Sequence, residues 1–260
     1  MWALVTGASS GIGRDMARYL HSLGYSLILV SRDEENMLNL KQELEENKVS
    51  KQEIIVIKKD LSKKENCIEL YKETKDIPLN LLVNNAGFGT FGEFIKTDLN
   101  KEIDLIETNI TAVHILTKLY LQDMVKNNKG YILNVASIAG MEPGPLMSSY
   151  YASKAYVIRL SRAINKELKK KKSNVKISIL CPGPVNTNFN NVANVVFKAP
   201  SMSSEKVAKY GINKALKGKL IIIPGILNKS VRFFSKILPD AVLEECAYHI
   251  QRRKNLIHKE

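Results

Sequence analysis

The chain has 260 residues, a formal charge of +13 and three widely spaced cysteines, Cys67, Cys181 and Cys246. This cysteine count excludes a disulfide framework, and neither the cysteines nor the four histidines have metal-ligand spacing, so we expect no metal. No apolar run is long enough to cross a membrane, and the sequence passes from Met1 straight into a strand and turn, which predicts no signal peptide and a cytoplasmic protein.

Short apolar strands alternate with helices along the chain. We expect strands at 3–6, 27–30, 54–57, 79–83, 131–135, 175–180 and 220–223. We expect helices from the first turn to 22, over 33–47, 62–75 and 100–125, and from about 150 to the lysines at 169–172. Continuous apolar strands separated by helices predict an α/β fold, a doubly wound, Rossmann-like parallel sheet of about seven strands with helices on both faces. No linker divides the chain, so we expect a single domain over 1–260.

Polar and glycine-rich motifs follow the expected strands. In a parallel sheet the carboxyl ends of all strands meet at one edge, where ligands bind. The first strand is followed by glycines at 7, 11 and 13, a spacing that suits close approach of a pyrophosphate to a helix N-terminus. The residues that converge on this edge are Gly7, Asp60, Asn85, Ser137 and Pro182.

Tyr150 and Lys154 are four residues apart, which places them one turn apart on one face of a helix. A nearby ammonium favours the phenolate, so we expect Lys154 to lower the pKa of Tyr150 from its usual value of roughly 10. Such a phenol could give and take a proton near neutral pH. Tyr151 is the alternative to Tyr150 in the same segment.

The combination of these motifs resembles the short-chain dehydrogenase/reductase family, of the common, non-extended type, over about residues 2–224. The matching motifs are Thr6-Gly7-Ala8-Ser9-Ser10-Gly11-Ile12-Gly13, Asn84-Asn85-Ala86-Gly87, the trio Ser137, Tyr150 and Lys154, and Pro182-Gly183. The resemblance implies hydride transfer between a nicotinamide cofactor and a carbonyl or secondary alcohol. It also selects Tyr150 over Tyr151.

The resemblance assigns roles to individual residues. Tyr150 would donate the proton, Ser137 would hold the carbonyl oxygen, and Lys154 would bind the ribose and tune the tyrosine. Asn109 matches a helix asparagine that supports a water relay to the lysine; the alternative is a polar residue on a helix surface. The residues expected to bind the cofactor are Gly7, Ser9, Ser10, Gly11, Ile12, Gly13, Arg32, Asp60, Leu61, Asn85, Ala86, Gly87, Tyr150, Lys154, Pro182, Gly183, Val185 and Thr187.

The end of the second strand indicates which cofactor is used. Ser31-Arg32 stands where a carboxylate would repel a 2′-phosphate, and a guanidinium suits phosphate, so we predict NADP(H) over NAD(H). Asp33 argues against this choice unless it begins the next helix. Asp60 and Leu61 resemble the pair that lines the adenine, although Asp60 could simply cap a helix.

Two segments are expected to wall the substrate. Between Ser137 and Tyr150, and again after Pro182-Gly183, most residues are apolar, which favours an apolar carbonyl compound, although ordinary packing gives the same composition. A lipid-like, steroid-like or 3-oxoacyl substrate is expected. The alternative to an enzyme is a non-catalytic NADP(H)-sensing protein of the same fold. The residues named for the two walls are Met141, Pro143, Pro145, Leu146, Met147, Val185, Thr187, Phe189, Val192, Val195, Val196 and Phe197.

Residues 226–260 form a basic extension within the domain. Residues 205–260 hold twelve Lys or Arg and five Asp or Glu, a net +7, which marks either a surface for anionic partners or a solvated tail. Apolar side chains at Ile226, Leu227, Val231, Phe234 and Leu238 share one helical face, opposite Lys229, Arg232 and Lys236. We expect this face to dock on its own domain or a second subunit in preference to a membrane surface. The resemblance implies a homodimer or homotetramer, and no motif predicts nucleic-acid binding.

Overall fold

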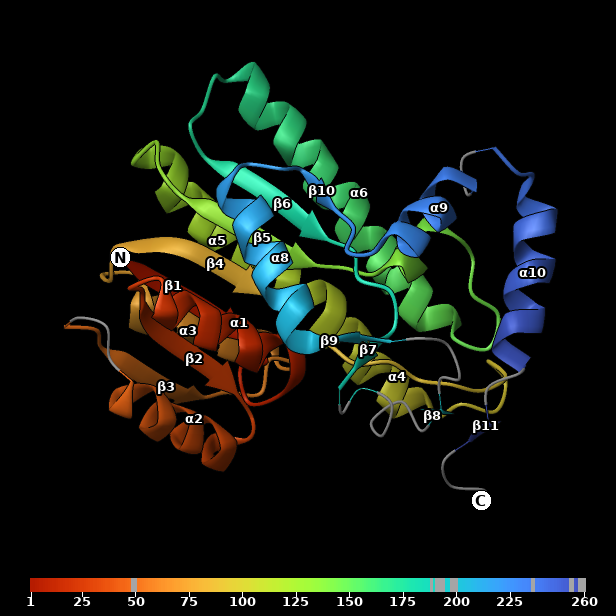
Figure 1. The fold of residues 1–260 in the computed structure, drawn as a ribbon, viewed down its shortest axis with the longest axis horizontal. Coiled ribbons are helices and arrows are strands. Elements are labelled where there is room, and N and C mark those ends of the chain that lie inside the picture. Colours follow the sequence, from red (N-terminus) through yellow and green to blue (C-terminus); the bar gives the residue numbers. More distant parts are fainter. Residues whose placement is uncertain are drawn as a thin grey trace.

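A computed structural model describes residues 1–47, 51–187, 189, 195–196, 201–234, 237–252 and 255–256. Its centre is a seven-stranded sheet in the order β10-β6-β5-β4-β1-β2-β3, in which every neighbouring pair is parallel (Figure 1). The order reverses on either side of β1, as in a doubly wound sheet. The strands are β1 (Trp2–Thr6), β2 (Ser26–Ser31), β3 (Ile54–Lys58), β4 (Leu79–Asn84), β5 (Tyr131–Val135), β6 (Lys176–Leu180) and β10 (Ile221–Ile222).

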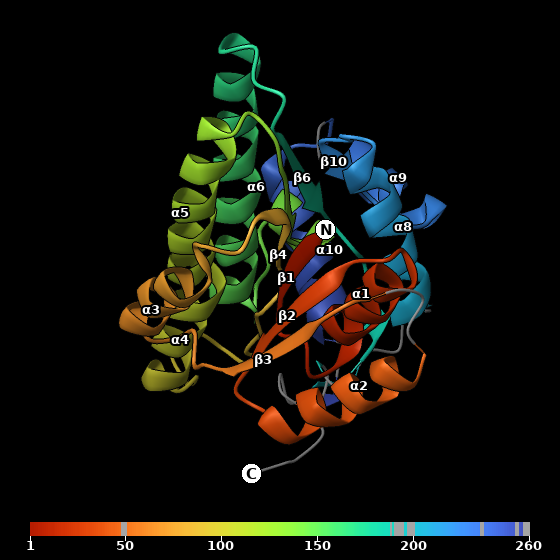
Figure 2. The ribbon, with the colours of Figure 1, turned by 90° about the vertical axis from the view of Figure 1, so that its left-hand side faces the viewer.

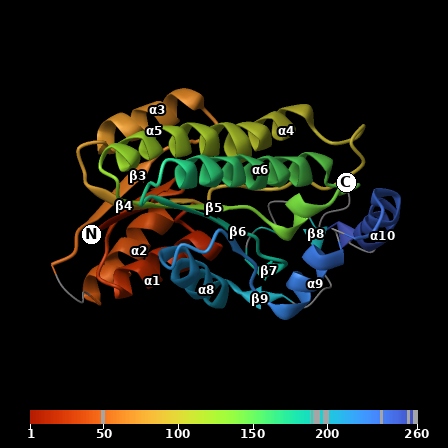
Figure 3. The ribbon, with the colours of Figure 1, turned by 90° about the horizontal axis from the view of Figure 1, so that it is seen from above.

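Helices cover both faces of this sheet, which confirms the predicted fold class. In Figures 2 and 3, α1, α2 and α8 lie on one side, and α3, α4, α5 and α6 lie on the other. The helices are α1 (Gly11–Ser22), α2 (Glu34–Glu46), α3 (Lys64–Thr74), α4 (Leu99–Ile106), the π-helix η1 (Glu107–Ala112), α5 (Val113–Lys126), the 3₁₀-helix η2 (Ile138–Met141), α6 (Ser148–Lys170), α8 (Ser204–Leu216), α9 (Ile226–Phe234) and α10 (Asp240–Arg252).

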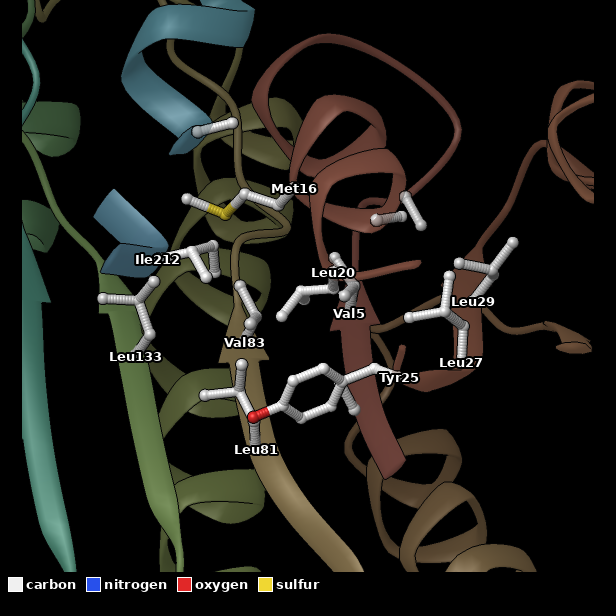
Figure 4. Close-up of a cluster of buried hydrophobic side chains, with 14 of the residues drawn as sticks. Val5, Met16, Leu20, Tyr25, Leu27, Leu29, Leu81, Val83, Leu133 and Ile212 are labelled. Carbon is white, nitrogen blue, oxygen red and sulfur yellow. The ribbon is translucent and has the colours of Figure 1, made fainter. Parts of the chain in front are cut away.

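Two hydrophobic layers hold the helices to the sheet. Side chains alternate along each strand, so Ala3 and Val5 pack under α1 and α8, whereas Leu4 packs in the layer beneath α3 and α5. Figure 4 shows the first layer, where Met16 and Leu20 of α1 contact the strands beside Ile212 of α8. These layers are dry and fully buried, so they fix the strand ends that carry the polar motifs.

The remaining strands are short pairs outside the main sheet. β7 (Val185–Asn186) pairs with β9 (Met202–Ser203), and β8 (Val195–Val196) pairs with β11 (Asn255–Leu256). Figure 1 places α9 and α10 beside the end of the sheet toward which the strands point. The C-terminal segment therefore lies close to the edge where the motifs converge.

Candidate active site

A cavity of about 660 Å³ opens at the carboxyl ends of the strands. Every residue expected to be catalytic or to bind the cofactor lines it except Gly13 and Asn109, which lie behind its wall. The predicted residues that line it are Gly7, Ser9, Ser10, Gly11, Ile12, Arg32, Asp60, Leu61, Asn85, Ala86, Gly87, Ser137, Tyr150, Lys154, Pro182, Gly183, Val185 and Thr187.

The glycine turn is held by the end of β4. The side-chain amide of Asn85 donates to the carbonyls of Thr6 (3.0 Å) and Gly7 (3.3 Å), and the Thr6 hydroxyl accepts from the backbone of Asn85 and Ala86, both at 2.9 Å. A Cβ on Gly13 would lie 2.2 Å from the Gly7 carbonyl oxygen, so only glycine allows this closeness. The turn thus presents backbone and the N-terminus of α1 to the cavity, which fits a pyrophosphate.

The end of β2 carries the residues expected to read the adenosine. Ser9 and Ser31 share a hydrogen bond of 2.9 Å between their hydroxyls. Asp33 caps α2 through Asn36, at 3.1 Å to the backbone nitrogen and 2.6 Å to the side chain, and these bonds lower its pKa. Asp33 therefore begins the helix, as the alternative proposed. Arg32 lines the cavity, and none of the ion pairs between described residues involves it.

Asp60 and Leu61 follow β3 at the same edge. The Asp60 carboxylate accepts from the backbone nitrogen of Ser62 at 3.0 Å, in a local turn. Because the helix α3 begins after Lys63 and has no side-chain cap, the reading of Asp60 as a helix cap is wrong.

Ser137, Tyr150 and Lys154 meet at the middle of the cavity wall. Tyr150 shares a hydrogen bond with Ser137, whose hydroxyl also donates to the carbonyl of Pro182 at 3.3 Å. The Lys154 ammonium donates to the carbonyl of Val135 at 3.1 Å and lies 5.8 Å from the centre of the Tyr150 ring. One turn of α6 and the end of β5 thus bring an acid, a hydroxyl and a cation to one surface.

Burial sets the pKa values of this group. Desolvation raises the pKa of Tyr150 to about 12, and the hydrogen bond with Ser137 offsets only part of that effect. Desolvation also lowers the pKa of Lys154 to about 8. The prediction that Lys154 lowers the pKa of Tyr150 is therefore wrong for the protein without cofactor. Desolvation of the phenol has the larger effect, and the Lys154 ammonium is hydrogen-bonded to the Val135 carbonyl.

Asn109 lies in the π-helix η1 and is fully buried, so its reading as a surface residue is wrong. Its amide accepts from the backbone nitrogen of Phe88 (3.1 Å) and donates to the Phe88 carbonyl (2.9 Å) and to Ser153 (3.0 Å). The Ser153 hydroxyl in turn donates to the carbonyl of Tyr150 at 2.7 Å. A Cβ on Gly87 would touch both Asn109 (2.7 Å) and the Lys154 ammonium (3.3 Å). Asn109 thus braces the strand end and α6 against each other.

The substrate side of the cavity combines apolar and polar side chains. Met147 and Phe189 come from the two predicted walls, and the Phe189 ring lies tilted against the Tyr150 ring with 5.3 Å between their centres. The prediction is wrong for four other residues of the first wall, which do not line the cavity: Met141, Pro143, Pro145 and Leu146. Val192 and Phe197 lie outside the described residues, as do the side chains of Val195 and Val196. The lining residues that sequence reasoning missed include Glu142 and, from the C-terminal segment, Leu227, Asn228, Ile250 and Gln251.

The C-terminal segment forms two helices with different surroundings. The apolar face of α9 is open, since Ile226 is 84% exposed and Leu227 is 73% exposed. The domain itself therefore does not cover Ile226 and Leu227, which contradicts self-docking of these side chains, whereas docking on a second subunit stays a prediction. Asn228 does meet the domain at Gly183, where a Cβ would lie 2.3 Å from its amide oxygen. Lys236 and the side chain of Val231 lie outside the described residues. By contrast, α10 buries Leu243, Ala247 and Gln251.

The described residues contain neither a cluster of metal ligands nor a membrane-spanning helix. No group of three or more His, Cys, Asp or Glu side chains within the described residues could hold a metal ion. Among the helices of the described part of the chain, none is both long and apolar enough to cross a membrane. Cys67, Cys181 and Cys246 are free thiols.

Comparison with known proteins agrees with this architecture. The family model described as short chain dehydrogenase matches residues 1–195. Hydroxysteroid dehydrogenase-like protein 1 of Gallus gallus is 31% identical over 99% of this chain and 79% of its own length. Very-long-chain 3-oxoacyl-CoA reductase of Anas platyrhynchos is 34% identical over 77% of this chain, and the match spans 64% of the reductase.

Solved structures show the same fold. A short-chain dehydrogenase from Sphingobium yanoikuyae in complex with NADPH gives a TM-score of 0.81 at 25% identity, covering 92% of this chain and 96% of that one. A short-chain dehydrogenase/reductase from Burkholderia phymatum in complex with NAD gives 0.80 at 25% identity, covering 90% and 92%. Between them, these two neighbours hold both forms of the cofactor.

Proposed function

This chain belongs to the short chain dehydrogenase family, and from that premise we propose that it reduces a carbonyl group to a secondary alcohol with NADPH. One observation carries the proposal: the half-buried side chain of Tyr150 lines the cavity, hydrogen-bonded to Ser137 and one helical turn from Lys154. The open glycine turn and the N-terminus of α1 fit a dinucleotide, which supplies the hydride when bound.

Side chains of the protein supply the proton for carbonyl reduction. With a pKa raised to about 12, Tyr150 is protonated at neutral pH, and it can donate to a carbonyl oxygen held by the Ser137 hydroxyl. The phenolate left behind lies near the Lys154 ammonium, which stabilises the negative charge. A protonated phenol at neutral pH supplies the proton that carbonyl reduction consumes. Asn109 keeps α6 in place through Ser153.

The substrate class is proposed from the cavity and the relatives together. Apolar side chains line the substrate side, and relatives are described as a 3-oxoacyl-CoA reductase and a hydroxysteroid dehydrogenase-like protein. We therefore propose a lipid-like, steroid-like or 3-oxoacyl substrate.

A panel of such ketones tests the proposal, with oxidation of NADPH followed by the loss of its absorbance. NADPH that binds while every ketone stays unreduced would instead support the sensing protein.

Replacing Arg32 with aspartate tests the cofactor choice. Arg32 lines the cavity, and its guanidinium is suited to bind the 2′-phosphate of NADPH. The neighbouring carboxylate of Asp33 caps α2 instead of competing for this position. We expect wild type to prefer NADPH in kcat/KM, and Arg32→Asp to lose on the order of 10- to 100-fold of that preference.

The matched control reverses a charge elsewhere. Lys166→Asp alters the net charge equally, at an exposed position twelve residues beyond Lys154 on α6, and should keep the preference. A wild-type enzyme that favours NADH on the same ketone would contradict the assignment.

The open face of α9 is the surface from which we propose a contact outside the domain. Its exposed apolar side chains include Phe233 and Phe234, and Lys229 and Arg232 lie on the same helix. An apolar face with basic neighbours suits an anionic lipid surface, so we propose peripheral membrane contact by a cytoplasmic protein. The family resemblance also supports a homodimer or homotetramer.

Vesicle co-sedimentation tests the lipid contact. We expect wild type to sediment with phosphatidylserine-containing vesicles and less with neutral ones, and Phe233→Ser/Phe234→Ser to stay in the supernatant. Val242→Ser, an exposed change on α10, serves as control. Wild type that ignores both kinds of vesicle would refute the contact, and ultracentrifugation would then show whether a second copy covers α9.

A further inference from the structure

The helix α10 closes one side of the cavity with a buried glutamine. Leu243, Ala247 and Gln251 are spaced four residues apart, so they share one face, and this is the face that the helix buries. The first two are apolar, as a packing face requires. Gln251 is only 1% exposed, although its amide carries two polar atoms that need partners.

Only one end of this amide is satisfied. The Gln251 nitrogen donates a short hydrogen bond to the hydroxyl of Tyr151. The amide oxygen is buried and has no hydrogen-bond partner among the described residues. Gln251 is one of the residues that line the cavity, so this unpaired acceptor lies in the wall of the space where a ligand would sit.

The acceptor lies next to the reacting end of the site. The ring of Tyr151 packs edge-on against that of Tyr150, with 6.2 Å between their centres. Thus only the side chain of Tyr151 lies between Gln251 and the acid Tyr150. The lining residues Met147, Leu227 and Ile250 are apolar, and Glu142 and Asn228 are further polar side chains in the cavity wall.

We propose that the Gln251 oxygen accepts a hydrogen bond from an N–H or O–H group that the substrate carries beyond its reacting carbonyl. This inference rests on the proposed function and adds a specificity-determining residue to it. The Tyr151 hydroxyl fixes the orientation of the amide, and the substrate donor replaces the missing partner of its oxygen. An apolar substrate without such a donor leaves that oxygen buried and unpaired, so it binds less well.

Two matched pairs of ketones test this with the full-length protein and NADPH. The first pair is the S-(2-acetamidoethyl) thioester of 3-oxooctanoic acid and its S-(2-acetoxyethyl) analogue, in which oxygen replaces the N–H. The second pair is a 17-ketosteroid with and without a 3-hydroxyl group. We expect about tenfold higher kcat/KM for the donor-bearing member of one pair, and that pair identifies the source of the donor.

Variants at position 251 connect the preference to this residue. Gln251→Met keeps the length of the side chain and removes the acceptor, so the ratio within the pair should fall to about one. Glu244→Gln, exposed on the same helix, should keep the wild-type ratio. If the methionine variant does not fold, Gln251→Glu, which retains a carbonyl acceptor, should keep the preference.

Three results would overturn the inference. Equal kcat/KM within both pairs in wild type would show that no donor is read. An unchanged ratio of kcat/KM within the pair in Gln251→Met, or loss of that ratio in Gln251→Glu, would show that another residue binds the substrate's donor group. Failure of the proposed function is distinct, because no member of either pair would then be reduced.

Discussion

Tyr150→Phe is expected to lower kcat for carbonyl reduction about a thousandfold while changing the Kd for NADPH by less than about twofold. The substitution removes only the proton donor, and general acid catalysis contributes roughly 10²- to 10⁴-fold. The phenylalanine ring keeps the packing on Phe189, 5.3 Å between centres, and on Tyr151. Steady-state reduction of a ketone and fluorescence titration of NADPH measure the two quantities.

Two further tyrosine variants make this result specific. Tyr156→Phe, on the same helix but bonded to His114 outside the cavity, should keep wild-type turnover. Tyr151→Phe leaves the acid in place and loosens Gln251, so it should lower kcat/KM far less than Tyr150→Phe does. If Tyr151→Phe were instead the inactive variant, the proton donor would be the alternative tyrosine.

Much of this site could be predicted because it depends on local spacing and on strand ends. The interval between Tyr150 and Lys154 is a property of any helix, and the structure places both side chains on the cavity wall. Asn85 directly follows β4, which pairs in parallel with β1, so the ends of the two strands lie side by side. Its hydrogen bonds to Thr6 and Gly7 follow from that pairing.

The pKa of Tyr150 could not be predicted in the same way. Sequence spacing gives the distance to a neighbouring charge, but not how much water each group loses. Here desolvation is the largest effect on both Tyr150 and Lys154. The bond of Lys154 to the Val135 carbonyl likewise depends on how α6 packs against β5.

Long-range packing also explains why the surroundings of Asn109 could not be predicted and why Gln251 was missed. Asn109 belongs to a π-helix, a register that its contacts with Phe88 and Ser153 support and that no sequence period indicates. Gln251 reaches the cavity from a helix a hundred residues after Tyr151. The spacing of Leu243, Ala247 and Gln251 was the available signal, since it marks a buried face that ends in a polar residue.

Lys154→Met is expected to abolish turnover and to stabilise the fold by about 2 kcal/mol at pH 7. A pKa lowered from 10.5 to about 8 means that burying the ammonium costs about 3 kcal/mol while it is charged. The variant removes that cost but loses the hydrogen bond to Val135, worth about 1 kcal/mol. Urea unfolding followed by circular dichroism measures the difference.

The pH dependence identifies the cause of this gain. Between pH 8 and 10.5 the unfolded chain keeps the Lys154 proton that the folded protein has released, so wild-type stability rises with pH relative to Lys154→Met. The difference in unfolding free energy between the two proteins should therefore be constant below pH 8 and shrink above it.

Lys166→Met, exposed on the same helix, is the control and should leave the unfolding free energy within about 0.5 kcal/mol of wild type at every pH. A Lys154→Met protein that unfolds more easily than wild type at pH 7 would show that the ammonium is a net structural support, and that its presence in the cavity wall needs no catalytic explanation.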